Sequence, residues 1–115
     1  MEKAFPILSN KTDIVAAFCN APDEKTARKI AERLLSEKAA ACINILSAGR
    51  SFYVWEGQTQ FAEEVPLIIK TTQAHILQAQ RIVQESHPDE VPEFIVLPVT
   101  EGLPEYLQWV RESCT

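Results

Sequence analysis

In the first third of the chain, a continuous run of hydrophobic residues is followed by hydrophobic residues at helical spacing. The segment "DIVAAFCN", residues 13–20, has the short apolar run of a buried strand. The segment that follows, residues 21–39, opens with Asp23 and Glu24, which suit the positive end of a helix. We expect one apolar stripe along this helix, formed by Ala27, Ile30, Ala31, Leu34 and Leu35.

Two β-rich runs come next, within residues 41–72, and they predict a hairpin. The runs lie on either side of Gly57, so the chain is expected to turn near "EGQ". Gly49 marks a bend or bulge in the first arm.

A second helix, a strand and a final helix complete the pattern. Thr72 can cap a helix over residues 73–86, and Pro88 prevents its continuation. The strand "EFIVLPVTEG" then leads to a short helix with Pro104 in its first turn. The expected buried positions of the two helices are Ile76, Ala79 and Val83, and Leu103, Leu107, Val110 and Cys114.

The resulting order is β-α-β-β-α-β-α. It predicts an α+β protein with the ferredoxin-like split βαβ fold, in which an antiparallel sheet carries its helices on one face. The runs "FYVWEG", "VPLIIK" and "FIVLPV" are nonetheless apolar at both odd and even positions, whereas a one-sided sheet alternates. The excess apolar surface indicates an oligomer whose sheets pack together, with clefts between subunits as sites.

Composition narrows the class of protein. The chain has 115 residues, of which 46% are hydrophobic and 23% charged, with a net charge of −5. These values predict one domain over residues 13–115, after a loose N-terminal tail over residues 1–12. There is no basic run for nucleic acid, no apolar segment long enough for a membrane and no secretory signal, so we expect a cytoplasmic protein.

The stretch "QESHPDEVPEFIV", residues 84–96, places His87, Glu90 and Glu93 three residues apart. That spacing would align them partly on one helix face. Pro88 and Pro92 exclude such a helix, because each removes a backbone donor and favours extended geometry in the residue before it. His87 is therefore expected to end a helix and Glu93 to begin a strand.

The cysteines Cys19, Cys42 and Cys114 are odd in number and widely separated, which predicts free thiols. No pair has CxxC spacing, and neither His75 nor His87 has a second histidine or a cysteine nearby, so any metal site must be assembled by the fold. Cys19 fits a small core residue as well as a ligand.

Several segments together resemble the CutA divalent-cation tolerance family: "CNAPDEKTARKIAERLLSEKAAACINI", "SFYVWEGQTQFAEEVPLIIKTT", "HPDEVPEFIVLPVTEG" and "YLQW". The resemblance extends from about residue 13 to residue 112. It implies a ferredoxin-like subunit, a homotrimer resembling the PII signalling proteins, and binding of copper or another divalent cation in a role in metal tolerance.

The resemblance also implies metal ligands. The family's strand-one cysteine falls on Cys19 and the histidine of its "HP…PE" segment on His87, and thiolate with imidazole suits copper or zinc. Other positions depart from the family's pattern: Ser86 replaces a second histidine found in some members, Asp89 a common tyrosine, and Glu101 a histidine. These exchanges favour Cu(II) or another divalent ion over Cu(I).

A cleft between subunits is implied around Tyr53, Trp55, Lys70, His87 and Glu93. Lys70 would need a carboxylate partner there, with Glu93 and Glu56 as candidates, or it could extend to water from its strand end. Trp55 and Tyr53 could instead pack within the trimer, and His87 could hydrogen-bond nearby backbone. An aromatic wall with a few convergent polar groups is typical of small-ligand pockets.

The expected function is therefore metal binding in or near intersubunit clefts, without enzymatic activity or an organic cofactor. No Walker loop, nucleophile elbow or dinucleotide fingerprint is present. Two alternatives remain open: a PII-like small-molecule sensor, and a trimeric scaffold for partner proteins.

Overall fold

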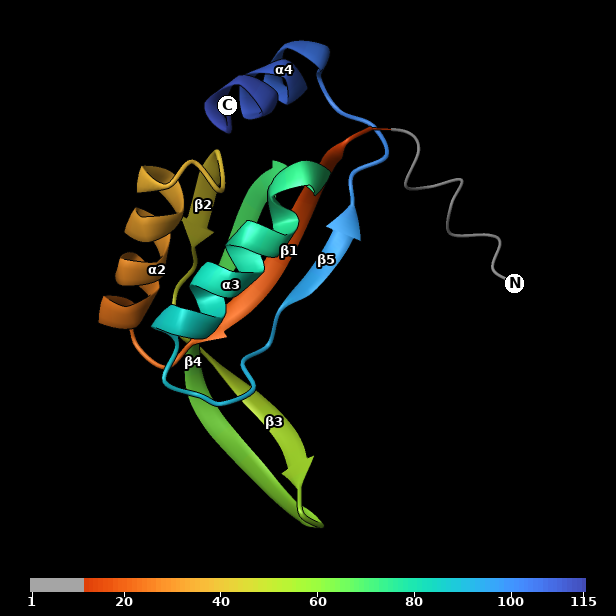
Figure 1. Ribbon diagram of the computed structural model, residues 1–115. Coiled ribbons are helices and arrows are strands. Elements are labelled where there is room, and N and C mark those ends of the chain that lie inside the picture. Colours follow the sequence, from red (N-terminus) through yellow and green to blue (C-terminus); the bar gives the residue numbers. More distant parts are fainter. Residues whose placement is uncertain (1–11) are drawn as a thin grey trace.

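The computed structural model describes residues 12–115 (Figure 1). The predicted tail over residues 1–12 lies, apart from Thr12, outside this part of the chain; the Thr12 hydroxyl oxygen accepts a hydrogen bond from the Ile14 amide at 3.1 Å. No helix in the described part is long and apolar enough to span a membrane. The elements are β1 (Ile14–Ala21), α2 (Glu24–Ser36), β2 (Cys42–Ile45), β3 (Gly49–Trp55), β4 (Gln58–Thr72), the 3-10 turn η1 (Gln73–His75), α3 (Ile76–Ser86), β5 (Ile95–Pro98) and α4 (Pro104–Ser113).

The sheet has the order β2-β4-β1-β5, with β3 also paired to β4, and all of these pairs are antiparallel. The predicted ferredoxin-like fold is confirmed. The first arm of the predicted hairpin is divided into β2 and β3, and β3 begins at Gly49, where the sequence indicated a bend.

Helices α2 and α3 lie side by side over one face of the sheet (Figure 1). Their buried residues, chiefly Ile30, Leu34, Ile82 and Val83, pack against Leu67 and Ile69 of β4 and Ala17 and Cys19 of β1. Helix α4 covers one end of the sheet, where Leu107, Val110 and Cys114 pack against Ile14 and Ala41. Two residues of the predicted stripes are exposed instead. Leu35 lies at the edge of the α2 stripe, and Leu103 precedes the first turn of α4.

The hairpin of β3 and the outer half of β4, residues 49–64, projects beyond the body and is called the arm (Figure 1). Its turn is formed by Glu56 and Gly57, both with positive φ, of 52° and 78°. Two such residues between paired strands are typical of a type I′ turn, which confirms the turn predicted at "EGQ". The arm exposes large apolar side chains, including 69% of Phe52 and 64% of Trp55.

On the sheet face opposite α2 and α3, helix α4 packs at one end against Ile14, and no described element covers the middle of the face. Direct antiparallel partners lie on the same face, so the pairs Phe18↔Ile68 and Phe18↔Ile95 place three apolar side chains together there. Phe18 is 37% and Ile95 55% exposed. We call this surface the open sheet face, and it agrees with the excess of apolar positions in the sequence.

Two adjacent leucines on α2 test the packing directly. Leu34→Ala should lower the free energy of unfolding by about 2–5 kcal/mol, because Leu34 is fully buried against the sheet. Leu35→Ala should change it by less than about 1 kcal/mol, because that side chain is half exposed. Urea unfolding at one fixed protein concentration measures both; equal losses would contradict the packing.

Candidate functional site

A groove of about 970 Å³ lies between the arm and residues 87–93, which are most of the segment that joins α3 to β5 and are here called the α3–β5 loop. The arm supplies one wall, the loop supplies the other, and Asn20 at the end of β1 lies between them. In Figure 1 the loop passes beside the base of the arm. The lining residues are Asn20, Ser51, Phe52, Tyr53, Trp55, Gln60, Glu64, His87, Asp89, Glu90, Val91, Pro92 and Glu93.

Asn20 holds the α3–β5 loop at both of its ends. Its backbone carbonyl oxygen lies 2.7 Å from Nε2 of His87, and its side-chain amide donates to Oε1 of Glu93 at 3.0 Å. The Asp89 amide donates to Nδ1 of His87 at 3.0 Å, which closes the first turn of the loop. We call these three hydrogen bonds the Asn20 clamp. The two bonds made by Asn20 fix the position of the second wall relative to β1.

His87 is buried, and both of its ring nitrogens are used by backbone groups. The neutral tautomer with hydrogen on Nε2 satisfies both bonds, since Nε2 then donates to the Asn20 carbonyl while Nδ1 accepts from the Asp89 amide. A metal ion could coordinate this ring only after one of the two bonds was broken. His87 therefore supports the loop rather than presenting a free ligand.

Cys19 does not line the groove. It is 1% exposed within the core between the sheet and the helices. Burial, with a smaller contribution from the negative charge of Glu93, raises the pKa of the Cys19 thiol to about 12. The thiol is therefore neutral at physiological pH when no metal ion is bound.

The sequence-predicted residues divide into two groups. Tyr53, Trp55, His87 and Glu93 come together in the groove, whereas Cys19, Glu56 and Lys70 are not among its lining residues. Lys70 lies on the open sheet face beside Ala16, and its amine donates to the side-chain oxygen of Asn44. Glu56 lies at the exposed tip of the arm.

The groove has negative charge and an aromatic wall. Glu64, Asp89, Glu90 and Glu93 contribute carboxylates, and none of its described lining residues is a lysine or arginine.

Asn20, Glu64 and Phe52 were not identified from the sequence as lining residues of this groove. The pairing of β4 with β1 places Asn20 at this site, and its pairing with β3 places Glu64 and Phe52 there.

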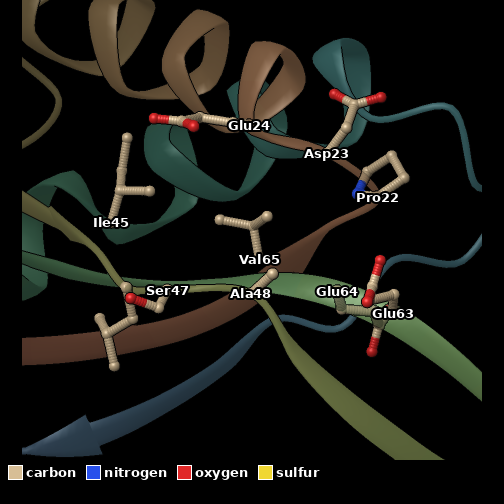
Figure 2. Close-up of a pocket in the computed structure, with 10 residues that line it drawn as sticks. Pro22, Asp23, Glu24, Ile45, Ser47, Ala48, Glu63, Glu64 and Val65 are labelled. Atoms are coloured by element: carbon tan, nitrogen blue, oxygen red, sulfur yellow. The ribbon is translucent and has the colours of Figure 1, made fainter.

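A second hollow of about 470 Å³ lies at the start of α2 (Figure 2). Ile45 and Val65 lie between the acidic pair Asp23 and Glu24 and the strand residues around Glu64. Asp23 is already engaged, because Oδ1 accepts from the Thr26 amide at 2.7 Å, and this bond lowers the pKa of Asp23. None of the seven predicted site residues lines this hollow, so it is not the leading candidate.

Within residues 12–115, no three His, Cys, Asp or Glu side chains converge to hold a metal ion.

The family model for CutA1 divalent ion tolerance protein matches residues 15–113. The chain belongs to this family. The divalent-cation tolerance protein CutA of Escherichia coli O45:K1 is 41% identical over 105 residues, which cover 91% of this chain and 94% of that protein. These matches confirm the resemblance read from the sequence segments, and the family is one of tolerance proteins.

Solved CutA structures share the fold. CutA from Xylella fastidiosa superimposes with a TM-score of 0.88 at 35% identity, covering 90% of this chain and 100% of that one. The CutA1 protein of Thermus thermophilus gives 0.85 at 38% identity, covering 87% and 97%. CutA from Archaeoglobus fulgidus, described as periplasmic, gives 0.86 at 33% identity, covering 89% and 99%. The cytoplasmic location of the present chain stays a prediction.

The Asn20 clamp predicts that His87 matters for stability. His87→Ala should lower the free energy of unfolding by about 1–3 kcal/mol, because the Asn20 carbonyl and the Asp89 amide lose their partner. His75→Ala is the matched control: that ring is half-buried and bonds only the nearby Thr72 hydroxyl, so the loss should be smaller. Thermal or urea unfolding of the two variants decides, and a His87→Ala protein as stable as the wild type would refute the clamp.

Proposed function

We propose that this CutA-family protein acts in divalent-cation tolerance as a homotrimer, and that the groove captures divalent cations through the carboxylates of its α3–β5 loop. The observation that carries the proposal is the composition of the groove wall: Asp89, Glu90 and Glu93 follow one another along a loop that the Asn20 clamp holds in place. Carboxylate oxygens are the ligands that hard divalent cations prefer.

The Cys19 and His87 pair fits a metal ion less well. The Cys19 thiol is neutral and buried in the core, and the His87 ring nitrogens are both hydrogen-bonded to backbone. Carboxylates need no such rearrangement, because Asp89, Glu90 and Glu93 are exposed in the protomer. Ions such as Mg²⁺ are commonly held by one or two carboxylates together with water, so a site without three convergent protein ligands is compatible with this chemistry.

The exposed apolar surface supports the trimer. Phe18 and Ile95 on the open sheet face, together with Phe52 and Phe61 on the arm, would remain in water in a monomer. Contiguous apolar patches of this kind mark interaction surfaces. A neighbouring subunit packed on these surfaces would lie beside the groove and could supply further ligands.

Manganese binding, measured by calorimetry on the intact protein, tests the proposal. Glu93→Gln should weaken Mn²⁺ binding about tenfold or more, because it removes a charge while keeping an oxygen that accepts from Asn20. Cys19→Ala should leave the affinity unchanged.

Glu105→Gln on α4 is the control for a carboxylate outside the groove and should bind Mn²⁺ as the wild type does. Light scattering of the same samples should give about 39 kDa, three times the 12.9 kDa chain. Loss of binding in Cys19→Ala with normal binding in Glu93→Gln would overturn the carboxylate site, and a monomeric mass would overturn the trimer.

A further inference from the structure

We infer that the groove also binds a small organic cation that carries a guanidinium group. This inference rests on the groove being the ligand site proposed above and adds a second class of ligand to it. It is carried by the two walls of the groove taken together, because one wall is aromatic and the other is acidic.

The aromatic wall lies on the arm. Trp55 and Tyr53 line the groove and alternate along β3, so their side chains project on the same side of that strand. Trp55 is 64% and Tyr53 46% exposed, which leaves both rings accessible in the protomer. A divalent metal ion is coordinated by oxygen atoms and not by aromatic rings, whereas a planar guanidinium stacks on them.

The acidic wall supplies the complementary contacts. Glu93 uses one carboxylate oxygen, Oε1, for the Asn20 amide, and Oε2 accepts no hydrogen bond from the described residues. Asp89 lies at the other end of the same loop, with its carboxylate 3.9 Å from the His87 ring. Guanidinium is the cation whose edge best fits carboxylates, because its donors form a fixed fork. Its face and its edge would thus meet different walls of one groove.

The volume and the charge of the groove favour a small molecule that carries no negative group. A volume of about 970 Å³ is at the upper end of small-ligand pockets. The lining has four carboxylates, Glu64, Asp89, Glu90 and Glu93, and no described cation, so a ligand that carried its own carboxylate would be repelled.

The experiment uses N-acetylarginine amide as the probe, N-acetylcitrulline amide as its neutral isostere and N-acetyllysine amide as a cation without a planar group. The chain has two tryptophans, Trp55 in the groove and Trp109 on α4, so the indole signals in an NMR titration report the place of binding. The arginine probe should shift the Trp55 indole signal and leave that of Trp109 unchanged. The citrulline probe should shift neither, and the lysine probe should bind more weakly than arginine.

Calorimetry on variants then measures how much each wall of the groove contributes to binding. Trp55→Leu should weaken the arginine probe about two- to fivefold, the size of an exposed cation–π contact. Glu93→Gln should weaken it about fivefold or more, whereas Trp109→Leu and Glu105→Gln should not change it. Light scattering of each variant checks that its assembly matches that of the wild type.

Equal binding of the arginine and citrulline probes, or of the arginine and lysine probes, would overturn the inference. A shift confined to the Trp109 signal would also overturn it.

A Mn²⁺ titration of the same sample separates the two proposals. Carboxylate-dependent Mn²⁺ binding without arginine binding removes the guanidinium ligand and leaves the proposed function standing. Arginine binding without Mn²⁺ binding removes the metal function and supports the guanidinium site.

Discussion

The continuous pairing of β4 determines most of this structure. Its inner residues, 65–72, pair with β1 and β2 inside the body and alternate between buried and less buried positions. Its outer residues, 58–64, pair only with β3 and form the arm. Because one unbroken strand serves both regions, the arm leaves the body in a fixed direction. The groove exists where this strand passes the α3–β5 loop.

The Asn20 clamp is the second constraint. It affects the metal ligands that the resemblance to CutA proteins implies. The resemblance implied Cys19 and His87 as metal ligands, but the first is a buried neutral thiol and the second is bonded to backbone through both ring nitrogens. His87 therefore acts on the groove indirectly, by holding Asp89 and the rest of the loop in position. Asp89, Glu90 and Glu93 are the exposed carboxylates that this loop presents to the groove.

The fold could be predicted largely from local signals. Gly57 identified the hairpin turn, Pro88 the end of α3, and the spacing of Ile30 and Leu34 the buried side of α2. The edges of the stripes were less certain: Leu35 and Leu103 follow the pattern, but their positions at the margin of α2 and the start of α4 leave them exposed. The composition of the sheet also indicated a surface that one chain does not cover.

The site could be predicted only in part, because it depends on contacts between distant residues. The partners of His87 illustrate this: Asn20 lies 67 positions earlier in the sequence, and only the fold brings its carbonyl to the ring. Lys70 illustrates the same limit, since the register of β4 against β1 and β2 directs it to Asn44 on the open sheet face and away from the lining of the groove. Tyr53, Trp55 and Glu93 were expected around a cleft between subunits; within one chain they line one groove, and the intersubunit cleft stays a prediction.

The most direct measurement is a crystal structure of the protein soaked in Mn²⁺, with the ion located by anomalous diffraction. We predict anomalous density in the groove beside the carboxylates of the α3–β5 loop, with Nε2 of His87 still bonded to the Asn20 carbonyl. Density between Sγ of Cys19 and a ring nitrogen of His87 would contradict the account.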